Sequence, residues 1–302
     1  MARNGILGLL LVLTCLSAKA GSGWTLNRGE AWFEGSVSSI SYSELWQQSS
    51  PFLQLQRPVT DFGIRLYAEY GLLDNVTLIG QLPYRMVSTG GEPQGSADFS
   101  DTLPVGNLNY LGNYRLGARY QVFNRSQTVV SLQGIVESNN SDLNQITGLQ
   151  TGFDAWSVEL LVAFGKSFPR SYLAGHGGMA IRTNQYSEEF LGQLEYGVNL
   201  TGGWWLMAVA DYRLSFRNGD RVPCNTRHTG LYVNNQEALS YGLKTLVPIT
   251  GNIGLSAGLY GALMADNLPA AFSFNGGVYW NPQFRRSGQV QQPVPSSARA
   301  RL

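Results

Sequence analysis

The chain has 302 residues, and only 14% of them are charged. Soluble proteins carry roughly 25% charged residues, so this low content indicates that much of the surface faces something other than water. The formal net charge of +1 supplies no basic field for nucleic acid. No metal-ligand spacing and no Gly-rich phosphate loop occur in the sequence, so no cofactor is expected.

The N-terminus has the three parts of a secretory signal peptide. Arg3 is basic, residues 6–16 are apolar, and Ala18-Lys19-Ala20 is a small-x-small cleavage site. We therefore expect residues 1–20 to be a signal peptide and the mature chain to start at Gly21. Loss of Arg3 and Lys19 with this segment changes the formal net charge from +1 to −1.

Two other interpretations of the N-terminus remain open. A retained membrane anchor would need a longer apolar stretch, because a helix crosses a bilayer with about 20 residues. A lipoprotein would be modified at Cys15, but Thr14 stands where such sites need a small residue.

From Ala31 to Trp280, apolar and polar residues alternate in runs of roughly ten. In the clearest run, 64–72, Ile64, Leu66, Ala68, Tyr70 and Leu72 share one face of a strand, while Arg65, Tyr67, Glu69 and Gly71 share the other. A tilted strand needs about 9–11 residues to cross a bilayer. Together with the export signal, this pattern predicts an all-β fold, a transmembrane antiparallel up-and-down β-barrel over residues 21–280 in the outer membrane of a Gram-negative-type bacterium.

The pattern predicts twelve strands, in chain order 30–40, 60–72, 75–86, 112–123, 126–138, 153–166, 170–182, 190–201, 203–216, 236–247, 251–264 and 270–280. Short turns are expected at Asp74-Asn75, Asn124-Arg125, Phe168-Pro169, Thr201–Gly203 and Pro248–Gly251. The other connections are 41–59, 87–111, 139–152, 183–189, 217–235 and the short 265–269. Alternating short and long connections are typical of outer-membrane barrels, and an even strand number leaves both ends in the periplasm.

One face of each predicted strand is apolar and is expected to contact outer-membrane lipid. On three of the strands these residues are Tyr114, Leu116, Ala118, Tyr120, Val122, Trp156, Val158, Leu160, Val162, Phe164, Leu255, Ala257, Leu259 and Leu263. Aromatic residues near the strand ends suit the two interfacial girdles of a membrane barrel. The alternative is a soluble sandwich or a lipocalin-like barrel with the aromatic residues in its core.

The last predicted strand ends on Trp280, as segments recognised by the barrel-assembly machinery usually do. Residues 281–302 follow it with four arginines, no acidic residue and no apolar periodicity. We expect this segment to be a disordered basic periplasmic tail. Contact of the tail with an acidic partner is the alternative.

Two segments resemble a known family. EYGLLDNVTLIGQLPY (69–84) is similar to the strand–turn–strand signature of the transporter family named for the MetA pathway of phenol degradation, and GNYRLGARYQVF (112–123) is similar to another strand of that family. Asn113 stands where that family usually has Asp. The resemblance implies an outer-membrane barrel that passes small, often aromatic or hydrophobic compounds.

The polar face of the strands is expected to line the lumen and the path of a solute. The charged residues on it are Arg65, Glu69, Arg115, Arg119, Glu137, Glu159, Arg182, Glu195, Asp211, Arg213 and Lys244. Arg115 and Arg119 lie four residues apart on one strand, so both point inward. An arginine ladder would favour anionic solutes, whereas a salt-bridge network would stiffen or plug the barrel.

An enzyme is not expected. Twelve strands also suit an outer-membrane phospholipase, but neither His176 nor His228 has a serine and an acidic partner in a suitable pattern. Residues 21–29 are too few to fold into a hatch, so we expect any constriction to come from the loops, above all from 87–111. Two functions remain: a channel for small solutes, or a sealed barrel that binds a partner through its tail or through Trp46, Phe52 and Leu55 of loop 41–59.

Overall fold

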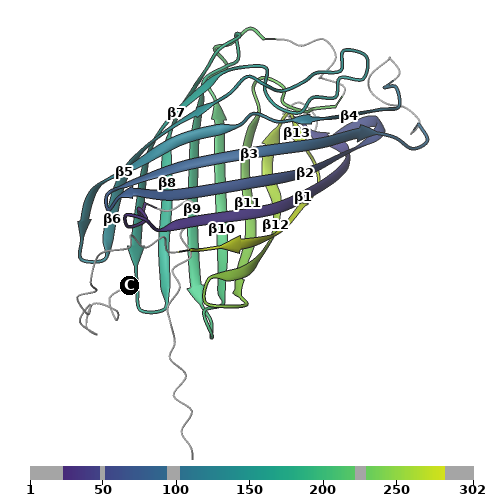
Figure 1. Cartoon of the computed structure of the whole chain (residues 1–302). Coiled ribbons are helices and arrows are strands. Elements are labelled where there is room, and N and C mark those ends of the chain that lie inside the picture. Colours follow the sequence, from purple (N-terminus) through teal and green to yellow (C-terminus); the bar gives the residue numbers. More distant parts are fainter. Residues whose placement is uncertain (1–22, 48–51, 94–102, 222–228, 283–302) are drawn as a thin grey trace, which may run out of the picture.

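The structure is a computed structural model that describes residues 23–47, 52–93, 103–221 and 229–282 (Figure 1). The predicted signal peptide and all but two residues of the predicted tail lie outside the described residues. Within the described part of the chain, no helix is long and apolar enough to cross a bilayer.

The described residues form one antiparallel sheet that closes on itself (Figure 1). Its strands are β1 (Ala31–Trp46), β2 (Leu53–Leu73), β3 (Val76–Thr89), β4 (Gly106–Leu111), β5 (Arg115–Arg125), β6 (Thr128–Glu137), β7 (Ser157–Ser167), β8 (Ser171–Arg182), β9 (Glu189–Asn199), β10 (Trp205–Ser215), β11 (Glu237–Pro248), β12 (Ile253–Asp266), β13 (Leu268–Pro269) and β14 (Ser273–Trp280).

The barrel has twelve strand positions, as predicted. Strand β1 pairs with β2 on one side and with β14 on the other, which closes the sheet. Both β4 and β5 pair with β3, so they are two pieces of one position, interrupted at residues 112–114. Likewise β13 and β14 both pair with β1.

Short connections gather at one end of the barrel, which we call the short-turn end; we call the opposite end the loop end (Figure 1). The turn after β2 is Asp74-Asn75, as predicted. The next turn is Ser126-Gln127 rather than the predicted Asn124-Arg125. Both of its residues have positive φ, 51° and 65°, the conformation of a two-residue turn that follows the twist of the strands.

The prediction of a long loop at 41–59 is wrong. Strands β1 and β2 are 16 and 21 residues long, and they stay paired as far as Leu45 and Leu53. Leu55, predicted to be exposed, is 1% exposed. It packs in a cluster at the loop end that we call the rim cluster, which consists of Tyr42, Leu45, Leu53, Leu55, Val59, Val87, Leu103, Leu149 and Leu231. The strands extend because their apolar face is buried by Leu103, Leu149 and Leu231, which belong to three loops.

The apolar face of the barrel points outward, as predicted. Leu116, Leu160 and Leu255 are exposed, and they belong to a belt of exposed apolar side chains that involves all of the long strands. Charged side chains such as Glu69, Arg119 and Glu159 are buried on the inner side. A soluble barrel has the reverse arrangement, so this is a transmembrane β-barrel.

Candidate functional site: the lumen and its two constrictions

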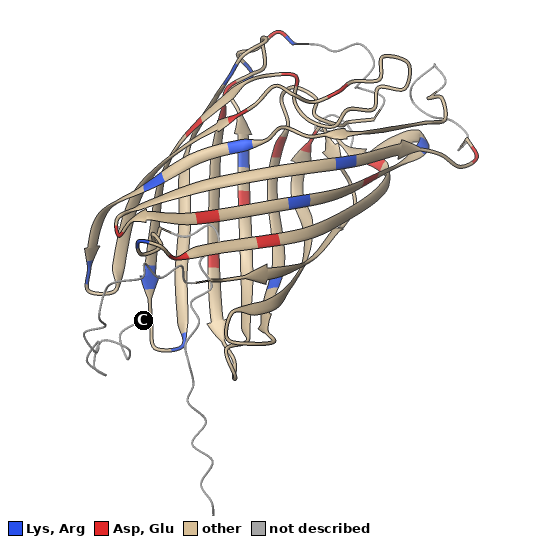
Figure 2. Ribbon diagram, viewed as in Figure 1, with Lys and Arg blue, Asp and Glu red and all other residues tan. Residues whose placement is uncertain are grey.

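The middle of the barrel encloses a polar cavity of about 770 Å³. Nine of the eleven charged residues predicted from the sequence line it: Arg65, Arg115, Arg119, Glu137, Glu159, Glu195, Asp211, Arg213 and Lys244. The other two, Glu69 and Arg182, lie in ion pairs beside it. With Glu34, the cavity lining holds five acidic and five basic residues. Figure 2 shows these signs interspersed along neighbouring strands rather than separated on two walls.

The two arginines of the predicted ladder are both paired. Arg119 is 1% exposed, and it contacts Glu69 at 3.3 Å and Gln133 at 2.9 Å. Arg115 lies between Glu137, at 3.4 Å, and Glu159. A charge buried in a narrow lumen is stable only when it is paired and hydrogen-bonded. These contacts therefore place Arg115 and Arg119 in a salt-bridge network.

Other charged groups of the lumen form hydrogen bonds to neutral side chains rather than ion pairs, or form no ion pair among the described residues. Asp211 accepts a 2.6 Å hydrogen bond from Gln193, and Glu195 accepts one of 2.5 Å from Tyr172. Among the described residues, none forms an ion pair with the ammonium group of Lys244. His176 lines the same cavity, whereas His228 lies outside the described residues.

The segment 23–29 lies inside the barrel at its short-turn end, and we call it the plug segment. The side chain of Arg119 donates to the carbonyl oxygen of Trp24 at 2.9 Å, and the backbone amide of Leu26 donates to Oγ1 of Thr77 at 2.8 Å. The hydroxyl of Ser131 donates to the carbonyl oxygen of Gly23. These partners belong to β5, β3 and β6, so the segment crosses the inner wall.

Aromatic side chains complete this constriction. Leu26 packs in one cluster with Trp32 of β1 and Tyr172 of β8, which are six strand positions apart in either direction around the barrel. Trp32 stacks on Tyr279 at 4.6 Å, and Trp24 meets Tyr172 edge-on at 5.9 Å. An apolar cluster that joins opposite walls fills the lumen at this level.

This arrangement corrects the expectation that any constriction must come from the loops. Residues 21–29 are indeed too few to form a folded hatch, but the described residues of that segment are sufficient to fill one end of a narrow barrel. A constriction therefore does not have to come from a loop. In loop 87–111, residues 94–102 lie outside the described residues, and Leu103 belongs to the rim cluster rather than to the lumen.

The loop end is narrowed by a layer of aromatic and arginine side chains, which we call the aromatic layer. The Phe153 ring meets Tyr186 at 5.5 Å and Tyr232 at 5.2 Å, both edge-on. The guanidinium of Arg182 lies 4.7 Å from the centre of the Phe153 ring, and that of Arg213 lies 5.9 Å from it. Cations attract the faces of aromatic rings, so these contacts hold Phe153 in place.

Three loops at this end supply the aromatic layer, and they carry Phe153, Tyr186 and Tyr232. The side-chain amide of Asn113 donates to the carbonyl oxygens of Ser138 and, at 2.8 Å, of Phe153. A carboxylate could not donate these bonds, which gives a physical reason for Asn where the similar family usually has Asp. The Tyr42 hydroxyl donates to the carbonyl oxygen of Thr229 at 2.6 Å and so ties the loop between β10 and β11, which carries Tyr232, to β1.

Tyr232 links this layer to the wall. Arg85 donates from Nε to its hydroxyl at 3.0 Å. Burial raises the pKa of the Tyr232 phenol, so the phenol stays neutral. Arg85, Phe153 and Tyr232 were not predicted as site residues. Arg85 lies on the inner face of β3 in alternation with Gln81 and Pro83, so the sequence pattern could have indicated it. Phe153 was placed in the predicted strand 153–166, but β7 begins only at Ser157. Tyr232 lies in a loop and follows no periodic pattern.

No protein-family model matches the chain, and no curated protein sequence does. Among solved structures, the COG4313 outer membrane channel from Pseudomonas putida F1 is similar, with a TM-score of 0.67, 17% identity, and coverage of 88% of this chain and 100% of that one. The NanC porin has a TM-score of 0.51 and 8% identity over 82% of this chain and 98% of that one. The translocator domain of the autotransporter NalP from Neisseria meningitidis has a TM-score of 0.51 and 13% identity over 85% and 90%. The chain therefore has the fold of a twelve-stranded outer-membrane β-barrel.

Proposed function

We propose that this protein is a gated outer-membrane channel for small solutes. The observation that carries the proposal is the charge-balanced polar cavity inside a barrel whose outer face is apolar. A lumen that served only to stabilise the barrel would not need this space. The predicted signal peptide supplies the export route, and the short-turn end then faces the periplasm.

The plug segment is the proposed gate. It fills the periplasmic end, so a solute in the cavity leaves only when the segment moves or when the aromatic cluster around Leu26 opens. The segment is short and joins the barrel at Ala31, so it can swing out without unfolding a strand. Such a channel would pass small molecules slowly and show brief openings.

The charges and aromatic rings that line the cavity indicate which class of solute it would accept. Equal numbers of acidic and basic residues give little net field, so the cavity favours small neutral or weakly charged molecules over highly charged ones. The aromatic layer supplies ring faces at the entrance. Both features agree with the small aromatic or hydrophobic compounds that the family resemblance implies.

The second candidate is a sealed barrel that binds a partner. The filled short-turn end favours it, because a closed lumen needs no solute. The outer loop surface offers less support than the sequence suggested: Leu55 is buried, while Phe52 is exposed and contacts Trp46 at 4.7 Å between ring centres. The predicted basic tail lies outside the described residues.

Single-channel recording of the purified barrel in a planar bilayer tests the proposal. Folding is checked first by the shift of the band on a gel between heated and unheated samples. We expect small, discrete current steps. A folded barrel that passes no current, both as the wild type and after deletion of residues 23–29, would support the sealed barrel instead.

A further inference from the structure

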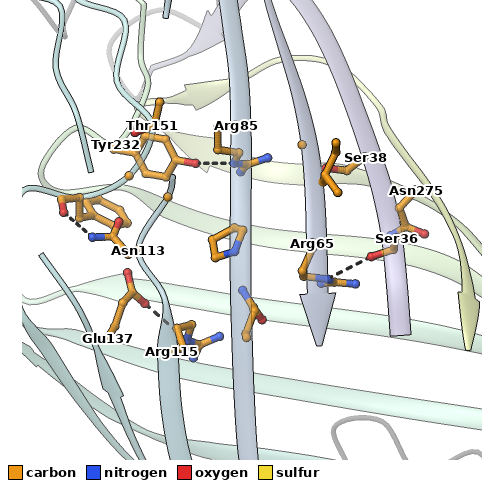
Figure 3. A pocket seen from close by; sticks show the side chains of 17 residues that line it. Ser36, Ser38, Arg65, Arg85, Asn113, Arg115, Glu137, Thr151, Tyr232 and Asn275 are labelled. Atoms are coloured by element: carbon orange, nitrogen blue, oxygen red, sulfur yellow. Dashed lines mark hydrogen bonds and ion pairs between the residues drawn. The ribbon is translucent and has the colours of Figure 1, made fainter. Parts of the chain in front are cut away.

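A second, smaller cavity opens beside the lumen near the loop end. Its volume is about 270 Å³, and it lies between the wall formed by β1, β2, β3 and β14 and the loops that carry Asn113, Phe153 and Tyr232 (Figure 3). Arg65, Gln81 and Phe153 are among the residues that line both cavities, so the two cavities adjoin. No part of the proposed gate lines it, since the gate closes the opposite end.

The register of four neighbouring strands places hydrogen-bond donors side by side on this wall. Asn275 is paired with Ser38, Ser38 with Gly63, and Gly63 with Arg85. In the next row toward the short-turn end, Ser36 is paired with Arg65. All of these positions line the small cavity, and Figure 3 shows the side chains of Arg65, Ser36 and Asn275 close together. We call Ser36, Ser38, Arg65, Arg85 and Asn275 the donor cradle.

Gly63 makes room for the cradle. A Cβ atom at this position would lie 2.7 Å from Nη1 of Arg85 and 2.8 Å from Oγ of Ser38. The guanidinium of Arg85 therefore lies over the glycine and next to the serine. It reaches this place only because position 63 has no side chain.

Both cradle arginines keep donors for a ligand. Arg65 contacts Ser36 through Nε at 3.2 Å and Glu34 through Nη2 at 3.7 Å. Arg85 contacts Tyr232 through Nε and Asp61 through Nη1 at 3.3 Å. Within the described residues, neither Nη1 of Arg65 nor Nη2 of Arg85 has a hydrogen-bond or ion-pair partner. The Arg65 side chain is also 43% exposed, in contrast to the buried Arg119.

We propose that the donor cradle binds the carboxylate of a small organic acid. Guanidinium groups hold a carboxylate through paired N–H donors, and the hydroxyl and amide groups of the cradle add further donors. The site moves anion recognition away from Arg115, which lies between two glutamates, and from the buried Arg119. Arg65 and Arg85 each face one carboxylate, Glu34 and Asp61, and each keeps an Nη donor. The proposal rests on the proposed function only for the route by which the acid reaches the site. The cradle would then be a binding site on the solute path.

Ligand-observed NMR of the folded barrel in detergent tests the binding directly. Propionate is titrated, and propionamide serves as a neutral molecule of the same shape. We expect saturable binding of propionate, with propionamide binding at least roughly tenfold more weakly, because hydrogen bonds to a charged group are the stronger ones. Arg65→Gln should weaken propionate binding by a similar factor.

Lys244→Gln is the matched control, because it removes one positive charge from the same lumen without touching the cradle. The proposal is overturned if Lys244→Gln and Arg65→Gln weaken binding equally, if propionamide binds as well as propionate, or if neither the wild type nor the Phe153→Ala variant, with its wider entrance, binds propionate. Binding without conductance would reject the channel and keep the cradle. Conductance without binding would reject the cradle alone.

Discussion

Replacement of Leu26 by Ala should open the channel. Leu26 is 4% exposed and packs between opposite walls of the barrel, with its backbone amide bonded to Thr77. Truncation of a buried leucine costs about 2–5 kcal/mol. Since the contact exists only while the plug segment is seated, the cost falls on the closed state and not on the open one.

The lower value, about 2 kcal/mol, corresponds to roughly a 30-fold larger population of the unplugged state, because 1.4 kcal/mol is a factor of ten. Single-channel recordings of the wild type and the variant at the same voltage measure this population as the open probability. The variant should spend far more time at the higher conductance level, while the gel shift that reports folding stays intact.

Leu72→Ala is the matched control. Leu72 lies near the same end of the barrel, but its side chain points outward and is 46% exposed. This variant should leave the open probability unchanged. If Leu26→Ala also leaves it unchanged, or if Leu72→Ala raises it equally, the plug segment does not gate the pore.

Three further results are expected. Gly165→Ala would place a Cβ atom 2.6 Å from the Trp24 ring, so it should unseat the plug segment and raise the open probability; an unchanged recording would contradict this. Phe153→Ala removes the central ring of the aromatic layer and should increase the unit conductance, whereas Trp156→Ala on the outer face should not. Glu69→Gln leaves the buried Arg119 without its ion pair and should cost about 3–5 kcal/mol, seen as a lower temperature for the gel shift; no change would mean that the introduced amide or the Trp24 carbonyl suffices as a partner.

The sequence predicted those features of the barrel that depend on the residue pattern within a single strand. Residues such as Leu116 and Arg115 occupy opposite faces because side chains alternate along a strand, so the outer and inner faces were readable without any partner. The twelve strand positions followed from the same alternation together with the turn residues. The prediction was wrong at 41–59, because the apolar partners that other loops supply to these strands were not visible in the sequence.

Only the tertiary structure decided what the inner residues contact. Arg119 and Glu69 are 50 residues apart in the chain, and Arg119 and Trp24 are 95 apart, so their pairing depends on strand register and on closure of the barrel. The plug segment has no periodicity of its own, because its conformation follows the wall on which it lies. The sequence by itself therefore determined which side chains face the lumen, while the closed barrel determined which of them fill it, which pair with each other, and which keep a donor without a partner among the described residues.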